Sequence, residues 1–95
     1  MAKKILVASG TSTNKMNFAL DTITKICAEK KVEVEVYGQN IYEVDIEKEK
    51  PDVIVIIGPN RFDTTIPIVS GMAFVTKMQM EKTVDEIIAK LVPPY

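Results

Sequence analysis

The 95-residue chain has no histidine, no tryptophan and a single cysteine, Cys27. Without histidine, Ser-His-Asp and Cys-His catalysis are excluded, and so are most zinc sites and a phosphohistidine of its own. We expect neither a metal ion nor a cofactor. One cysteine cannot form an internal disulfide, which suits a reducing compartment.

The chain also lacks an excess of charge of either sign and a long hydrophobic run. Twelve basic and thirteen acidic residues give a net charge of −1, which argues against binding to nucleic acid. The apolar run near the amino terminus, Ile5–Ala8, is too short for a signal peptide or a transmembrane helix. We therefore expect a soluble, cytoplasmic protein whose residues 1–95 form one small domain.

The hydrophobic pattern alternates between strands and helices. Continuous apolar runs at Ile5–Ala8 and Asp52–Ile57 predict strands that are buried on both faces. From Thr13 onward, apolar residues recur at three- and four-residue spacing, which predicts a helix of about four turns with Thr13 or Asn14 as its N-cap. The same spacing predicts a last helix at Glu81–Leu91.

The remaining segments are shorter. Val32–Val36 alternates apolar and charged residues, which predicts a strand with one exposed face that is ended by Gly38-Gln39-Asn40. A helical turn is expected near Asp45–Glu49. Ile66–Val69 predicts a fourth strand, in which Pro67 lies at the start or on an edge because it cannot donate to a β-ladder.

This order of elements predicts an α/β fold with parallel strands and right-handed crossovers. We expect a Rossmann-like, doubly wound three-layer domain with four strands in the order 2-1-3-4. Ligands of such sheets bind beyond the carboxyl ends of the strands, at the switch point beside the first strand. That rule selects residues 9–14, with residues 58–65 and 70–72 as neighbours.

The selected loop carries four hydroxyls and one glycine at the start of a helix. Backbone N–H groups and the positive end of the helix dipole make a phosphate cradle there. A polar strand-to-helix turn with a Thr or Asn cap is the simpler alternative, and the GxxxxGK[ST] pattern of a P-loop is absent. The candidate phosphate-binding residues are Gly10, Thr11, Ser12, Thr13 and Asn14.

Two segments carry a resemblance to a known family. The sequence resembles the galactitol-type enzyme IIB components of the bacterial sugar phosphotransferase system, from Lys3 to the last helix. In that family a phosphocysteine loop beginning Cys-Gly-Thr/Gly-Gly follows the first strand, and Ser9-Gly10-Thr11-Ser12 stands at that place here. The more specific segment is Asp63–Val75, which contains Ile66–Phe74. Relatives have a similar Ile-Pro-(Ile/Leu)-Val-x-Gly-x-x-Phe segment before a terminal helix.

The resemblance implies a phosphotransferase. Such proteins accept a phosphoryl group from a phosphohistidine of enzyme IIA and pass it to a sugar that the membrane-embedded enzyme IIC imports. The resemblance places Ser9 at the catalytic position, where relatives have cysteine. Because a serine hydroxyl needs a neighbouring base and the chain has no histidine, we expect Ser9 to be a poor phosphocarrier.

Ser9 leaves alternatives open. It is either an engineered replacement of a cysteine or a native residue of a divergent paralogue, and the departures at Ser12, Lys15 and Met16 favour the second origin. The alternative function is a non-catalytic IIB-like module that binds anions or regulates and has lost the thiol. A third hypothesis is a flavodoxin-type flavin carrier, which the lack of tryptophan disfavours.

Three further features have a structural and a functional interpretation. Cys27 lies on the apolar stripe of the first helix, so we predict a buried, structural residue rather than a second carrier. Arg61, the sole arginine, is either a phosphate contact or a solvated loop cation. Three methionines near the fourth strand are candidates for a partner surface, and these are Met72, Met78 and Met80.

Overall fold

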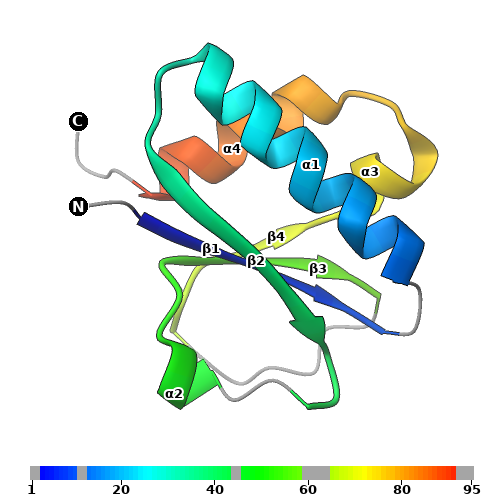
Figure 1. Cartoon of the computed structure of the whole chain (residues 1–95), viewed down its shortest axis with the longest axis vertical. Helices are drawn as coiled ribbons and strands as arrows, with labels where there is room; N and C mark the ends of the chain where they lie inside the picture. The colour runs from blue at the N-terminus through cyan, green and yellow to red at the C-terminus, as the bar shows by residue number, and fades with distance from the viewer. Residues whose placement is uncertain (1–2, 11–12, 44–45, 59–64, 92–95) are drawn as a thin grey trace.

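A computed structural model describes residues 3–10, 13–43, 46–58 and 65–91 (Figure 1). The strands are β1 (Lys3–Ser9), β2 (Val34–Asn40), β3 (Val53–Ile57) and β4 (Ile68–Ser70). The helices are α1 (Thr13–Glu29), α2 (Ile46–Glu49), α3 (Met72–Thr76) and α4 (Met80–Leu91). None of the helices in these ranges is long and apolar enough to cross a membrane.

The four strands form one parallel sheet in the order β2-β1-β3-β4, which confirms the predicted topology. In the register, Ile5 of β1 lies opposite Val36 of β2 and Val53 of β3. The apolar runs that predicted β1 and β3 are buried in both strands. Strands without a polar face are expected where helices or other chain segments cover both sides of a parallel sheet.

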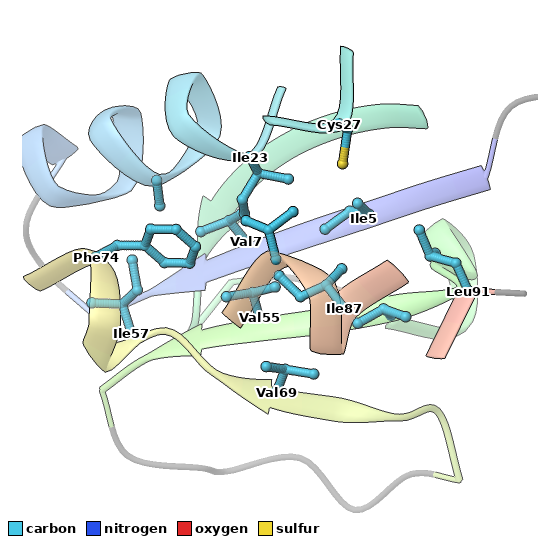
Figure 2. Close-up of a cluster of buried hydrophobic side chains, with 13 residues drawn as sticks. Ile5, Val7, Ile23, Cys27, Val55, Ile57, Val69, Phe74, Ile87 and Leu91 are labelled. Carbon is cyan, nitrogen blue, oxygen red and sulfur yellow. The ribbon is translucent and has the colours of Figure 1, made fainter. Parts of the chain in front are cut away.

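Helices α1, α3 and α4 lie on one face of the sheet, and α2 lies on the other (Figure 1). The main core is the layer between the sheet and α1, α3 and α4, and Figure 2 shows its apolar side chains converging from these elements. A smaller cluster on the α2 face contains Leu6, Ala8, Ile41, Ile54 and Ile56. The alternation of side chains along β1, with Ile5 and Val7 on one face and Leu6 and Ala8 on the other, follows from strand geometry.

Strand β2 corrects the sequence prediction. Gly38, Gln39 and Asn40 were expected to end the strand, but β2 continues through them and pairs with β1 up to Ser9 opposite Asn40. The glycine is explained by close packing, since a Cβ at Gly38 would lie 2.7 Å from the Met16 sulfur and 3.2 Å from Leu20 Cδ1. Gly38 therefore brings helix α1 close to the sheet instead of breaking the strand.

Strand β4 is an edge strand and begins one residue after Pro67. The prediction for the proline is confirmed, although the strand comprises Ile68–Ser70 and not Ile66–Val69. Pro67 still contributes its carbonyl, which accepts a hydrogen bond from Ile54 N at 2.9 Å. The missing N–H thus falls just outside the ladder.

The helices match the predicted pattern with one addition. Val84, Ile87 and Leu91 of α4 are buried, as their spacing predicted, and α2 coincides with the expected turn apart from Asp45, which lies outside the described residues. Helix α3 was not predicted. Its five residues are too few to show a helical period, and Phe74 is its one buried residue.

Helices α1 and α4 are joined by an ion pair at the surface. Lys30 Nζ lies 3.0 Å from Asp85 Oδ1 and 3.6 Å from Glu81 Oε1. The hydrogen bond to Asp85 raises the pKa of Lys30 above its ordinary value, and the charges of both carboxylates act in the same direction. The ion pair fixes the end of α1 beside the start of α4.

Cys27 is fully buried in the main core, as predicted (Figure 2). Burial raises the pKa of its thiol, and the nearby positive charge of Lys30 opposes the rise only in part. At neutral pH the sulfur is therefore a protonated, inaccessible thiol. Both properties oppose reaction, because the thiolate is the nucleophile.

We expect Cys27 of the native protein to react with Ellman's reagent at least roughly a hundredfold more slowly than in urea, because reaction requires opening of the core. The rate of thionitrobenzoate release at neutral pH measures this. The matched control is Ala28→Cys in a Cys27→Ala background, which places a thiol on the exposed neighbouring position of α1. Labelling of native Cys27 as fast as that of the control would show that Cys27 is accessible and a candidate for a carrier.

Candidate functional site

The carboxyl ends of β1 and β3 form the switch point of the sheet. Beyond β1 the chain enters α1 on one face, and the connection that contains α2 reaches β3 on the other face (Figure 1). In a sheet of this order the connections beside β1 and β3 run on opposite faces, and ligands of such sheets bind at the carboxyl ends of the strands. The structure thus places Ser9, Gly10 and the start of α1 where the topology predicted a site.

Ser9 is the last residue of β1 and is only 4% exposed. Among the residues that the structure describes, Ser9 is the only polar one that is buried. Its carbonyl accepts a hydrogen bond from Ile41 N at 2.8 Å, and its neighbour across the ladder in β3 is Ile57. Because Ser9 continues the alternation of Ile5 and Val7, its side chain lies on the face that α1 and α3 cover.

Gly10 and Gly58 lie side by side where β1 and β3 end. Gly10 N donates to Ile57 O at 3.3 Å, and a Cβ built at Gly58 would lie 3.9 Å from Gly10 N. Gly58 has φ +132°, a conformation that is strained for any residue with a side chain. Space around Gly10 is open, since a Cβ there would meet no atom within 4 Å. The backbone at the end of β1 can therefore be approached closely.

The rest of the predicted loop is described in part. Thr11 and Ser12 lie outside the described residues, and so does Arg61. Helix α1 begins at Thr13, so Thr13 and Asn14 are its first and second residues, and neither is the N-cap, which precedes the helix. The side chain of Asn14 is exposed in the first turn, where helix N–H groups have no partner within the helix and the dipole is positive.

Asn40, the last residue of β2, forms a turn at the carboxyl edge of the sheet that was not predicted from the sequence. Asn40 Oδ1 accepts a hydrogen bond from Tyr42 N at 2.8 Å, which folds the chain back directly after the strand. A hydrogen bond from the backbone N–H two residues on to an Asn side chain defines an Asx turn. The sequence would have suggested this turn if Gly38-Gln39-Asn40 had been assigned to the strand, because Asn40 would then stand at the strand end.

Helix α3 follows β4 directly, on the side of β3 away from β1. Gly71 N donates to Ile56 O at 2.7 Å, and Met72 N donates to the Ser70 hydroxyl at 3.3 Å. Met72 and Met78 are exposed, whereas Met80 packs against the main core. Met72 and Met78 are thus accessible to a partner and Met80 is largely not, and partner binding by the methionines stays a prediction.

The described residues contain no group of three or more His, Cys, Asp or Glu side chains that could hold a metal ion. The donors at the edge are backbone N–H groups and amide or hydroxyl side chains. Such donors bind anions through hydrogen bonds and the helix dipole.

The sheet order and the helices define a doubly wound α/β domain, in which the connection from β1 to α1 starts at the switch point.

Among solved structures, the chain is similar to the lactose-specific IIB component domain of the phosphoenolpyruvate:carbohydrate phosphotransferase system from Streptococcus pneumoniae. The TM-score is 0.68 and the identity is 13%, over 97% of this chain and 100% of that one. It is also similar to an Enzyme IIB subunit of the PTS system from Escherichia coli K12, with a TM-score of 0.55 and 14% identity over 94% of each chain. No family model and no curated protein matches the sequence.

The two neighbours show that this chain has the fold of phosphotransferase-system IIB domains. The likeness covers nearly the whole length of both chains, so it concerns the domain as a whole.

Proposed function

We propose that the chain is a IIB domain of a bacterial sugar phosphotransferase system, with the loop after β1 as its phosphoryl site. The observation that carries the proposal is the position of Ser9, the buried last residue of β1, directly before the open backbone at Gly10 and the amino terminus of α1. The sequence resemblance puts the family's phosphocysteine at this residue. The IIB fold, reached independently of that resemblance, supports the same assignment.

The proposed route has two transfers. The phosphoryl group leaves the histidine nitrogen of enzyme IIA and bonds to the side-chain atom at position 9, whose proton is released to the freed imidazole. It then passes to a sugar bound by the membrane permease, enzyme IIC. The galactitol type of the system is proposed from the segment Ile66–Phe74, and the location is the cytoplasm, where these partners meet.

A non-catalytic anion-binding module is the second candidate, and the chemistry of Ser9 favours it. The hydroxyl is little exposed, and the chain has no histidine to remove its proton. A serine without a base accepts a phosphoryl group slowly. The cradle of backbone donors does not depend on the side chain at position 9, so anion binding persists without the transfer.

Both candidates require the cradle, and we expect inorganic phosphate to bind it with a dissociation constant of about 1 mM to 10 mM. Amide shifts in a phosphate titration should concentrate at residues 10–14 and at Gly58. Asn14→Asp should weaken binding by roughly two- to fivefold, because it adds a negative charge in the first turn of α1. Asn17→Asp, the same change at an exposed position further along α1, serves as the control.

Amide shifts that spread over the lysines of α4 would show nonspecific binding to basic surface. Equal effects of Asn14→Asp and Asn17→Asp would show that phosphate does not bind at the first turn of α1. Either result would remove the phosphate cradle from the proposal.

A further inference from the structure

A pocket of about 280 Å³ lies between the first turns of α1 and helix α3, beside the loop discussed above, with which it shares Asn14. Figure 1 shows α3 beside the amino-terminal half of α1, on the same face of the sheet. Its walls are apolar where Phe18, Phe74 and Val75 line it, and Figure 2 shows the Phe74 ring pointing from α3 toward the core. The polar lining residues are Asn14, Lys15 and Lys77.

The charge of this pocket has one sign. Two lysines line it, and the lining residues that the structure describes include no carboxylate. Lys77 Nζ lies 5.2 Å from the centroid of the Phe18 ring, within the range of a cation–π contact. The ammonium group is thus held beside an aromatic wall.

The backbone contributes to this arrangement. Lys77 is the C-cap of α3 and has the left-handed conformation, with φ 61° and ψ 33°. The chain turns at this residue, so its side chain extends back over α1 and contacts Phe18. Phe18 and Lys77 are 59 positions apart in the sequence, and the fold alone brings them together.

We propose that this pocket binds a small aromatic anion, a single ring that carries a carboxylate or a similar acidic group. The ring fits the apolar walls, and the anion fits the two lysines at the rim. A cavity of about 150 Å³ is enough to hold benzene, so the volume here accommodates a ring with its acidic substituent. The charge complementarity selects an anion over a neutral or cationic aromatic compound.

The proposal does not depend on the phosphoryl-transfer function. The pocket shares only Asn14 with the candidate phosphate cradle, and its aromatic walls have no counterpart in that loop. A carboxylate probe keeps the two sites apart experimentally, because the cradle is read out at residues 10–13 and the pocket at Phe18, Phe74 and Val75.

The test is a titration of isotope-labelled protein with benzoate, with acetate and benzyl alcohol as probes that lack the ring or the charge. Benzoate should shift the Phe18, Phe74 and Val75 resonances, give intermolecular NOEs to the partly exposed Phe18 ring, and bind with a dissociation constant of about 1 mM. Acetate and benzyl alcohol should each bind at least roughly fivefold more weakly, because each loses one of the two complementary contacts.

Variants separate the pocket from general surface charge. Lys77→Gln should weaken benzoate binding by roughly two- to fivefold, and Lys15→Gln should act in the same direction. Lys82→Gln, the same change at an exposed position of α4, should leave binding unchanged. The proposal is overturned if benzoate shifts no pocket resonance, if acetate or benzyl alcohol binds as well, or if Lys77→Gln and Lys82→Gln have equal effects.

Discussion

Gly71→Ala should lower the free energy of unfolding by about 2 kcal/mol and the melting temperature by about 10 °C. A Cβ at Gly71 would lie 2.7 Å from Ile57 Cγ1 and 2.9 Å from the Ile56 carbonyl oxygen. Both atoms belong to the buried end of β3, which cannot shift without moving the sheet. The clash exceeds the gain of up to about 1 kcal/mol that alanine brings by restricting the unfolded chain.

Gly10→Ala is the matched control, since a Cβ there would meet nothing within 4 Å. We expect its free energy of unfolding to stay within about 0.5 kcal/mol of the parent, or to rise slightly. Urea denaturation of the three proteins measures the difference. A Gly71→Ala protein as stable as the Gly10→Ala protein would mean that α3 does not pack against β3 as described.

The parts of the fold that sequence patterns predicted are those with a long or unbroken apolar signal. Buried runs identified β1 and β3, and the three- and four-residue spacing identified α1 and α4. These patterns arise directly from burial, so the sequence carries them. The alternation of strands and helices then restricted the topology to the order that the structure shows.

The errors fall where a residue's role depends on a distant neighbour. Gly38 was interpreted as a strand end because glycine is common in turns, but its place in β2 is explained by Met16 and Leu20 of α1. Helix α3 contains five residues, too few for a period to appear. Local propensity cannot reveal a close approach between two elements.

The candidate site divides in the same way. The position of Ser9 and Gly10 at the carboxyl end of β1 was predictable from the apolar run before them, and the structure shows it, whereas their role in binding a ligand stays a prediction. The pocket between α1 and α3 was not predictable, since it depends on Lys77 reaching Phe18 from a helix that the sequence did not indicate.

The central claim is that position 9 is the phosphoryl acceptor, and a thiol at that position should show it. We expect Ser9→Cys to accept a phosphoryl group from phosphorylated enzyme IIA roughly 100- to 10,000-fold faster than the parent, because a thiol ionises far more readily than a hydroxyl and the chain has no histidine to activate Ser9. Backbone donors and the dipole at the start of α1 should lower the thiol pKa, as at other helix amino termini. The same groups stabilise the charge of the incoming phosphoryl group.

A matched control excludes a general effect of adding a thiol. Ser70→Cys places a cysteine at the exposed end of β4, two strands from β1, and Cys27 stays buried in every variant. This control should accept no more phosphoryl group than the parent. The phosphorus NMR signal of the adduct distinguishes a phosphocysteine from a phosphoserine.

The decisive measurement is therefore the rate of phosphoryl transfer from labelled phospho-enzyme IIA of the galactitol type to the parent, Ser9→Cys and Ser70→Cys proteins. The account predicts rapid formation of a phosphocysteine in Ser9→Cys alone, with slow or negligible transfer to the other two. Equal, negligible transfer to all three folded proteins would contradict it and leave the non-catalytic anion-binding module as the function of this fold.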